Sequence, residues 1–310
     1  MSVSEEKNIF ITGVSGFIGR YIARYLTRQG WSVFGCDTIS IENAPTEYLV
    51  KYFEIELPNS TFDELLKQIK PYACIHCAGR ASVPQSYEYL RDDFENAPIL
   101  VFDLLESLKN SSPESRFLFM SSAAVYGDPS RLPISENHTS SPISPYGFHK
   151  RQAELICEEF AKVFGIKTLS ARIFSAYGPG LRRQVVWDIC RRIMDHESVY
   201  LQGTGEETRD FVHVTDIAIA VQLLIKSATF EGETYNVASG QETSIQSISK
   251  IICDALDVSI PIKFSGVLPD GVPRKWRADI GKIKTLGFDC SVAIESGISD
   301  FATWVRSQFS

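Results

Sequence analysis

Short apolar runs alternate with longer amphipathic segments through the first half of the chain. The runs are rich in β-branched and aromatic side chains and predict strands at residues 8–12, 31–37, 73–78, 116–122 and 167–173. The segments between them predict helices at residues 17–28, 61–69, 92–109 and 147–164. Each predicted strand is apolar on both faces, as burial between two helical layers requires. The pattern therefore predicts an α/β fold with a doubly wound parallel sheet.

The alternation becomes irregular beyond about residue 176. A Gly/Pro-rich turn, a predicted helix at 184–195 and a loop come first. Strand and helix then return over 211–225, and one more strand is expected at 233–238. We therefore predict two parts. A doubly wound domain would comprise residues 1–176 plus about 210–240, and a smaller α/β lobe about 177–209 plus 241–310.

The composition is that of a globular protein of 310 residues, 44% of them hydrophobic, with a net charge of −7. Nucleic-acid binding depends on clustered Lys and Arg, so the acidic balance argues against a nucleic-acid partner. No apolar run approaches the roughly 18 to 20 residues of a membrane span. The start, MSVSEEKNIF, has acids where a signal peptide has basic residues. We expect no membrane partner.

The seven cysteines are odd in number and scattered, which is typical of reduced thiols in a cytoplasmic enzyme. Cys74 and Cys77 have the spacing of a redox or metal pair. They lie in a predicted buried strand without a second pair, so plain buried cysteine is the better interpretation. His76, His149 and His213 show no metal-ligand spacing either, and we predict no metal site.

A glycine-rich segment follows the first predicted strand and opens the first predicted helix. It reads Gly13-Val14-Ser15-Gly16-Phe17-Ile18-Gly19. Gly13 allows a tight turn, Gly16 lets the backbone approach a diphosphate, and Gly19 lets the helix pack closely on the sheet. The helix N-terminus adds amide donors and a partial positive charge. The placement between strand and helix, more than the spacing alone, predicts a dinucleotide site that includes Phe17 and Ile18.

Asp37 ends the second predicted strand, 18 residues beyond Gly19. A carboxylate at this position accepts hydrogen bonds from both ribose hydroxyls of an adenosine and repels a 2′-phosphate, which favours NAD over NADP. Arg20, close to the glycine loop, would soften that preference. The alternative role for Asp37 is to cap a turn.

Tyr146 and Lys150 are one helical turn apart at the start of a predicted helix, and so they share one face. A phenol has a pKa of about 10 and is a poor base near neutral pH. A nearby ammonium and a positive nicotinamide ring would lower that pKa. Tyr146 would then remove a proton from a hydroxyl while hydride leaves for the nicotinamide, and Lys150 would also hold the nicotinamide ribose.

The predicted strand 116–122 ends in Ser121 and Ser122, which are followed by Ala123 and Ala124. Hydroxyls at the carboxyl end of a parallel strand lie beside the crevice where ligands bind in this architecture. Ser122 would donate to the same substrate oxygen as Tyr146 and relay its proton. The alternative is that both serines only satisfy the strand end.

The glycine loop, the serine-bearing strand end and the Tyr146–Lys150 pair together resemble the extended short-chain dehydrogenases/reductases. Among these the chain is similar to the nucleotide-sugar epimerase/dehydratase family, and to UDP-glucose 4-epimerases within it. The resemblance runs over nearly the whole chain. It implies a Rossmann domain that binds NAD, a lobe that binds a nucleotide-diphosphate sugar, and Ser122, Tyr146 and Lys150 as the catalytic triad.

The same resemblance assigns further residues. Cys77, Ala78 and Gly79 would line the cofactor, and Asn96 would support the site. The family also commonly forms homodimers through two helices per chain, here near residues 92–109 and 147–164, which make a four-helix bundle.

Further matches lie in the substrate lobe. Residues 172–180, RIFSAYGPG, resemble the family's R-x-F-N-x-Y-G-P-G, with Ser175 in place of the substrate-binding asparagine. Arg209 would bind the diphosphate, since a planar bidentate donor suits phosphate oxygens. Arg274 takes the place of a second phosphate arginine in a looser match, and a surface salt bridge is its alternative role.

The residues after Ser122 limit the reactions that the chain could catalyse. Dehydratases and decarboxylating members have acids there, whereas this chain has Ala123 and Ala124, which argues against dehydration. We expect an NAD-dependent nucleotide-sugar epimerase, an isomerase acting at carbon 4 by transient oxidation of a hydroxyl. The alternative is an oxidoreductase, an NAD(P)H-dependent reductase of a nucleotide-linked 4-keto-6-deoxy sugar. Residues 269–275 resemble the tail of such ketosugar reductases.

Overall fold

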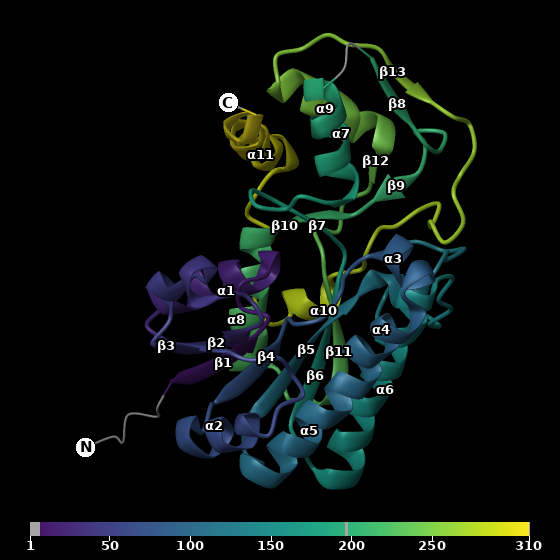
Figure 1. Ribbon diagram of the computed structural model, residues 1–310. Helices are drawn as coiled ribbons and strands as arrows, with labels where there is room; N and C mark the ends of the chain where they lie inside the picture. Colours follow the sequence, from purple (N-terminus) through teal and green to yellow (C-terminus); the bar gives the residue numbers. More distant parts are fainter. Residues whose placement is uncertain (1–6, 196–197, 310) are drawn as a thin grey trace.

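A seven-stranded sheet lies at the centre of the larger part of the protein in a computed structural model that describes residues 7–195 and 198–309. The strand order is β11-β6-β5-β4-β1-β2-β3, and each neighbouring pair is parallel. The order runs outward from β1 and β4 in both directions, and helices lie on both faces (Figure 1). The predicted doubly wound α/β fold is therefore confirmed.

The strands agree closely with the apolar runs. They are β1 (Asn8–Thr12), β2 (Ser32–Asp37), β3 (Lys51–Glu54), β4 (Ala73–His76), β5 (Arg116–Ser122), β6 (Thr168–Ile173) and β11 (Glu231–Val237). Strand β3 was not predicted, because it is a four-residue edge strand with a single buried side chain. Strand β4 ends at His76, which leaves Cys77 in the loop that follows.

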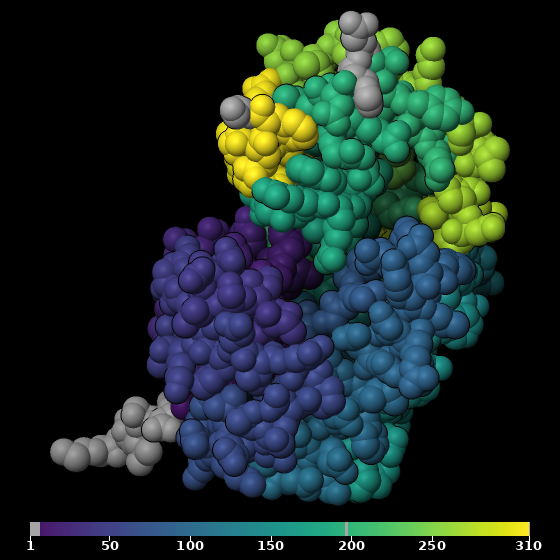
Figure 2. Space-filling view, in the orientation of Figure 1, coloured from purple at the N-terminus to yellow at the C-terminus, as the bar shows by residue number. Residues whose placement is uncertain are grey.

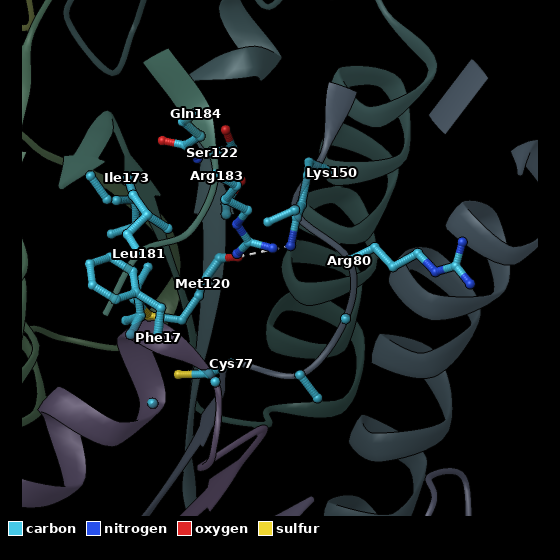
Figure 3. A pocket seen from close by; sticks show the side chains of 18 of the residues that line it. Phe17, Cys77, Arg80, Met120, Ser122, Lys150, Ile173, Leu181, Arg183 and Gln184 are labelled. Carbon is cyan, nitrogen blue, oxygen red and sulfur yellow. Dashed lines mark hydrogen bonds between the residues drawn. The ribbon is translucent and has the colours of Figure 1, made fainter. Parts of the chain in front are cut away.

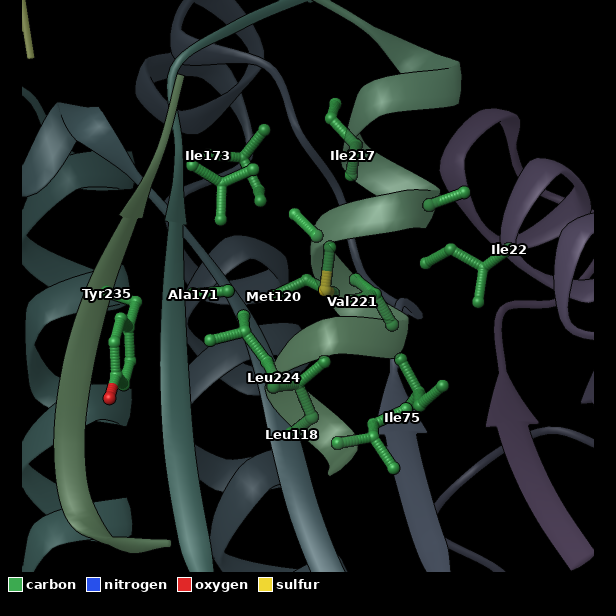
Figure 4. Close-up of a cluster of buried hydrophobic side chains, with 14 of the residues drawn as sticks. Ile22, Ile75, Leu118, Met120, Ala171, Ile173, Ile217, Val221, Leu224 and Tyr235 are labelled. Atoms are coloured by element: carbon green, nitrogen blue, oxygen red, sulfur yellow. The ribbon is translucent and has the colours of Figure 1, made fainter. Parts of the chain in front are cut away.

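Two helical layers cover the sheet (Figure 1). Helices α1 (Phe17–Arg28) and α8 (Val214–Ser227) pack together on one face, and α2 (Thr61–Ile69), α5 (Leu100–Ser111) and α6 (Pro145–Phe164) cover the other. Figure 4 shows the first interface, where Ile22, Val221 and Leu224 meet Ile75 and Leu118. All five side chains are fully buried. Each such burial stabilises the fold by roughly 1.5–3 kcal/mol.

The predicted helix at 92–109 consists of three consecutive pieces. They are α4 (Leu90–Phe94), a π-helical turn, η3 (Glu95–Ile99), and α5. Pro98 lies inside the π-helical turn. A proline removes one backbone donor and clashes with the preceding turn of a regular helix, and the wider turn accommodates it. The short helix α3 (Val83–Glu88) precedes α4 and was not predicted.

The smaller part, at the top of Figure 1, has a hydrophobic core of its own, in which Ile189, Ile248 and Phe301 are fully buried. Its elements are α7 (Gln184–Asp195), α9 (Ile245–Ala255), α11 (Ile294–Phe309) and the strand pairs β8 (Val199–Leu201) with β13 (Ile262–Phe264) and β9 (Thr208–Arg209) with β12 (Thr243–Ser244). None of the helices in the described ranges is long and apolar enough to cross a membrane.

The remaining elements are short. Strands β7 (Ser175–Tyr177) and β10 (Phe211–His213) form a parallel pair between the two parts. The others are η1 (Ile41–Asn43), η2 (Thr46–Tyr48), η4 (Ala123–Tyr126) and α10 (Gly281–Lys284).

A buried carboxylate, Asp210, ties three distant segments together just before β10. One oxygen accepts the Ser239 N–H at 2.8 Å, and the other accepts the Gly240 and Ala278 N–H groups, each at 3.0 Å. Asp210 is fully buried, so these amides have no water to replace the carboxylate. The bonds join β11 and the C-terminal segment to the junction between the two parts.

We predict that Asp210→Ala lowers the free energy of unfolding by about 3 kcal/mol, because it leaves the Ser239, Gly240 and Ala278 amides without their acceptor. Urea unfolding followed by circular dichroism measures the change. Asp270→Ala is the matched control, since Asp270 is exposed and its loss should change stability by less than about 0.5 kcal/mol. Equal effects of the two substitutions would contradict this account.

Candidate active site

Two adjoining cavities lie at the carboxyl ends of the sheet strands. The first has a volume of about 420 Å³ and the second about 300 Å³. Both are lined by Gly16 and by residues 77–80, so they are the two ends of one groove. Figure 2 shows the surface hollowed between the upper and lower parts of the molecule. This is the place where ligands bind in open parallel sheets, outside the strand ends where the strand order reverses.

The glycine loop forms the shared wall through close backbone packing. Gly13 has a φ of +68°, and a Cβ at this residue would lie 2.5 Å from the Ala78 nitrogen. A Cβ on Gly19 would lie 2.3 Å from the Gly13 carbonyl oxygen. Gly16 precedes α1 and provides no side-chain cap, while Phe17 and Ile18 in its first turn line the first cavity. The free amides at this helix end suit an anionic ligand.

Asp37 lines the second cavity at the end of β2. One carboxylate oxygen accepts the Ser15 N–H at 2.9 Å and the other accepts the Thr38 N–H at 2.8 Å. The side chain therefore caps the turn, which was its alternative role, and also lines the cavity. Each oxygen retains a lone pair for a ligand hydroxyl. The Arg20 guanidinium donates to the Asn43 carbonyl at 3.3 Å on the same rim.

The loop after β4 packs against the π-helical turn. A Cβ on Gly79, whose φ is +109°, would lie 2.8 Å from the Asn96 carbonyl oxygen. The Asn96 side chain donates to the Asp92 carbonyl at 2.8 Å and lines the second cavity. Burial raises the pKa of the Cys77 thiol to about 12, which leaves it protonated. Within residues 7–195 and 198–309, no group of His, Cys, Asp and Glu side chains is arranged to hold a metal ion.

The first cavity brings together Ser122, Tyr146 and Lys150. Ser122 ends β5, and Tyr146 and Lys150 lie in the first turns of α6. Figure 3 shows Ser122 and Lys150 in the cavity. Ser144 caps α6 by accepting the Gly147 N–H at 3.2 Å. A Cβ on Gly147 would lie 2.5 Å from the Ala124 carbonyl oxygen, so the helix start packs directly on the loop after β5. The closeness of Tyr146 to Ser122 depends on this glycine.

Burial dominates the electrostatics of the pair. It lowers the pKa of Lys150 to about 8, and the nearby Asp93 carboxylate opposes that change. It also raises the pKa of Tyr146, against the effects of the Ser122 hydroxyl and the Arg183 guanidinium. The sequence suggested that Lys150 would lower the tyrosine pKa. In the protein alone, the ammonium donates to the Met120 carbonyl at 3.0 Å, and desolvation of the phenol outweighs nearby charges.

Two buried histidines near the site have structural partners. His149 Nδ1 lies 2.5 Å from the Asp93 carboxylate, which joins α6 to α4. His76 Nδ1 lies 2.7 Å from the Thr12 hydroxyl, and burial lowers the pKa of this imidazole to about 3. His76 is therefore neutral and holds β4 to β1.

A buried ion pair joins the strand ends to α6. The Arg172 guanidinium donates to both carboxylate oxygens of Glu154, each at 2.8 Å. Ser121 donates to the same carboxylate at 2.7 Å. Ser121 thus has a structural partner, and both Ser121 and Ser122 line the first cavity.

The three residues assigned to the substrate lobe lie in different surroundings. Ser175 is in β7, and the first cavity is lined by its neighbours Phe174 and Ala176 instead. Arg209 stacks on Trp276 at 5.5 Å, and burial lowers its pKa to about 10.

Arg209 and Arg274 differ in their ion pairing. No carboxylate in the described part of the chain forms an ion pair with Arg209. Arg274, in contrast, pairs with Asp128 at 2.6 Å, and 72% of its side chain is exposed. The surface salt bridge considered for Arg274 is therefore present.

Several cavity-lining residues were not singled out from the sequence. Among them, Arg182 and Arg183 lie between the YGPG turn and α7, and Gln184 is the first residue of α7. Gln184 has a φ of +67°, an unfavourable conformation for a residue with a side chain. The only local signal was the pair of arginines in the loop, because the direction of each side chain depends on the turn.

We predict that Asp93→Asn lowers the pKa of Lys150 below about 8, because the substitution removes the carboxylate that most favours the ammonium. The extent of Lys150 acetylation against pH, measured by mass spectrometry, reports this pKa directly. Asp92→Asn is the control, since Asp92 is half exposed and pairs with Arg80 at 3.2 Å. The account fails if both variants label as the wild type does.

Comparison with known proteins identifies the same family that the sequence motifs resemble. The profile of the NAD dependent epimerase/dehydratase family matches residues 9–238. The putative UDP-glucose 4-epimerase of Methanocaldococcus jannaschii is 26% identical over 309 residues, covering 96% of this chain and 98% of that protein. The GDP-6-deoxy-D-mannose reductase of Pseudomonas aeruginosa is 29% identical over 266 residues, covering 83% of this chain and 82% of that protein.

A solved structure is similar over nearly the whole chain. It is the UDP-N-acetylglucosamine 4-epimerase of Methanobrevibacter ruminantium in complex with UDP-N-acetylmuramic acid. It superposes with a TM-score of 0.87 at 29% identity, covering 98% of this chain and 99% of that one.

Proposed function

Because the chain belongs to the NAD dependent epimerase/dehydratase family, we propose that it is a nucleotide-sugar epimerase that inverts carbon 4 of the sugar. The observation that carries the proposal is the convergence of Ser122, Tyr146 and Lys150 in one cavity beside the glycine loop. Ala123 and Ala124 place no acid after Ser122, which argues against dehydration. The likeness to a 4-epimerase over the full chain adds support.

The groove fits NAD by its own chemistry. The first-turn amides of α1 have no partner within the helix and suit a diphosphate, and Asp37 offers two oxygens to the adenosine ribose. Cys77, Ala78, Gly79 and Asn96 line the same groove, together with Gly16, Phe17 and Ile18. Lys150 would hold the nicotinamide ribose. When bound, NAD supplies a hydride acceptor and a positive charge next to the phenol.

Tyr146 would accept the proton of the sugar hydroxyl, with Ser122 donating to the same oxygen. The buried phenol needs positive charge nearby to ionise, because burial alone raises its pKa. Lys150 keeps its ammonium below a pH of about 8 and provides part of that charge. After the ring turns, the hydride would return to the opposite face of carbon 4 and Tyr146 would return the proton to its oxygen, so that the product is the 4-epimer.

We assign ligand binding to the two parts in the same way. Residues 1–176 plus about 210–240 would form the NAD-binding Rossmann domain, and about 177–209 plus 241–310 the nucleotide-sugar lobe. Arg209 supports this division, since a buried guanidinium without a carboxylate partner suits a diphosphate. Ser175 and Arg274 remain proposed substrate ligands. Arg274 would have to exchange Asp128 for the phosphate.

A panel of nucleotide sugars, incubated with and without added cofactor, tests the function. We expect interconversion of two 4-epimers without added NADH or NADPH, because the hydride returns to the same sugar. Chromatography of the products measures it. Stoichiometric consumption of reduced cofactor with a 4-ketosugar would instead establish a reductase, for which the Pseudomonas relative is a precedent.

We predict that Tyr146→Phe lowers kcat by about 10²–10⁴-fold while NAD affinity changes little, since the ring stays and only the proton-transfer group is lost. Initial rates and a fluorescence titration with NAD separate the two effects. Tyr200→Phe, which alters an exposed tyrosine in β8, should leave both unchanged. Unchanged turnover in Tyr146→Phe would refute the assigned base.

We further propose a cytoplasmic homodimer. The cysteines of the chain are free thiols, as is typical of that compartment. Helices α5 and α6 expose Phe102, Phe148, Leu155 and Phe164, apolar side chains that a second copy would cover in a four-helix bundle.

Leu155→Glu should convert the dimer to a monomer, because it places a charge in the apolar interface. Light scattering after size exclusion measures the mass. Val267→Glu is the control, since Val267 is also exposed but lies far along the chain near β13. A wild-type protein that is monomeric would overturn the dimer proposal.

A further inference from the structure

The first cavity is cationic in an otherwise acidic protein. Arg80, Lys150, Arg182 and Arg183 line it, and none of its described lining residues is Asp or Glu. The chain as a whole carries a net charge of −7. A site of one sign, walled by protein, concentrates ligands of the opposite sign. The cavity is therefore suited to a substrate that carries negative charge close to the reacting group.

Most of these cations already have partners. Lys150 donates to the Met120 carbonyl, and Arg80 pairs with a carboxylate outside the cavity at 3.2 Å. The Arg182 guanidinium lies over the Trp304 ring at 5.9 Å and donates to Gln308 in α11.

Arg183 differs from its neighbour. It makes no hydrogen bond, ion pair or ring contact with any residue in the described ranges. Figure 3 shows its side chain pointing into the cavity that Ser122 and Lys150 line. Its charge reaches Tyr146, because the guanidinium lowers the pKa of that phenol against the effect of burial. Arg183 is thus the available cation beside the proposed base.

The positions of the substituents on the sugar ring indicate which negatively charged group can reach Arg183. In the proposed reaction, carbon 4 and its hydroxyl lie at Tyr146. Carbon 6 is two bonds from carbon 4, whereas the diphosphate is attached to carbon 1, across the ring. A group near both Tyr146 and Arg183 is therefore a substituent at carbon 3, which is a neutral hydroxyl in a hexose or a hexuronate, or the substituent at carbon 6. A neutral hydroxymethyl group would leave the guanidinium without a partner, while a carboxylate matches its planar fork with two hydrogen bonds.

We infer that Arg183 binds a carboxylate at carbon 6, and that the substrate is a nucleotide-linked hexuronate. The inference rests on the proposed 4-epimerase function and names its substrate class. Arg183 then acts as a specificity-determining residue that also orients the ring toward Tyr146. The neighbouring Arg182 has the same charge but is turned toward Trp304, so it does not share this role.

Steady-state kinetics with UDP-glucuronic acid and UDP-glucose test the inference. We expect the wild-type kcat/KM to favour the uronate by about 10-fold, because Arg183 is exposed in the open cavity and solvent weakens a charge pair there. Arg183→Gln should remove about 10-fold of kcat/KM for the uronate and less than about 3-fold for the hexose. Arg182→Gln removes the same charge one residue away, and we expect the uronate-to-hexose ratio to stay within about 3-fold of wild type.

Two kinetic results would overturn the inference. Equal losses for both nucleotides in Arg183→Gln would place the diphosphate, and not a ring carboxylate, at Arg183. A wild-type preference for the hexose would exclude a uronate substrate while leaving the 4-epimerase proposal intact.

Calorimetric titration of the wild-type protein with each nucleotide separates the subsite from the reaction. Tighter binding of UDP-glucuronic acid that is lost in Arg183→Gln supports the subsite even if neither sugar is interconverted, in which case only the proposed reaction fails. Equal affinity for the two nucleotides, or binding of neither, overturns the subsite.

Discussion

The close approach of two backbone loops, after β1 and after β4, is the constraint on which the rest of the site depends. A single added methyl group on Gly13 would lie 2.5 Å from the Ala78 nitrogen, and one on Gly19 would lie 2.3 Å from the Gly13 carbonyl oxygen. Because no side chain fits there, the loops pack closely, and the start of α1, whose first-turn amides have no partner within the helix, lies at the wall that both cavities share. The dinucleotide site is thus defined by packing that excludes side chains.

The proposed catalytic residues are held by a second kind of constraint, buried polar contacts beneath the groove. The Glu154–Arg172 ion pair joins α6 to β6, and Ser121 joins the same carboxylate to β5. Breaking such a pair leaves an uncompensated buried charge, so these elements keep their relative positions. The same burial removes solvent from Tyr146 and Lys150 and moves both pKa values toward the neutral forms. Charge supplied by ligands then has a strong effect on the phenol.

The cations of the first cavity contrast with the net negative charge of the whole chain. The chain is acidic overall, yet every charged residue described in the lining of the first cavity is a cation. Arg182 and Arg183 are adjacent in sequence, but one lies over Trp304 and the other enters the cavity. An unusual backbone turn at Gln184, with a φ of +67°, follows them directly. In the proposed function, substrate choice depends on the loop that precedes α7, while the redox chemistry depends on residues positioned by the sheet and α6.

The sequence by itself determined the parallel sheet, the glycine loop and the Ser122, Tyr146 and Lys150 set, because periodicity and short spacings along the chain encode these features locally. The tertiary structure decided what depends on contacts between distant segments. It revealed the edge strand β3, paired Arg274 with Asp128 on the surface, and directed the Lys150 ammonium to the Met120 carbonyl. It also turned Arg183 into the cavity. Desolvation and side-chain direction arise only when separate elements pack, and no local pattern records them.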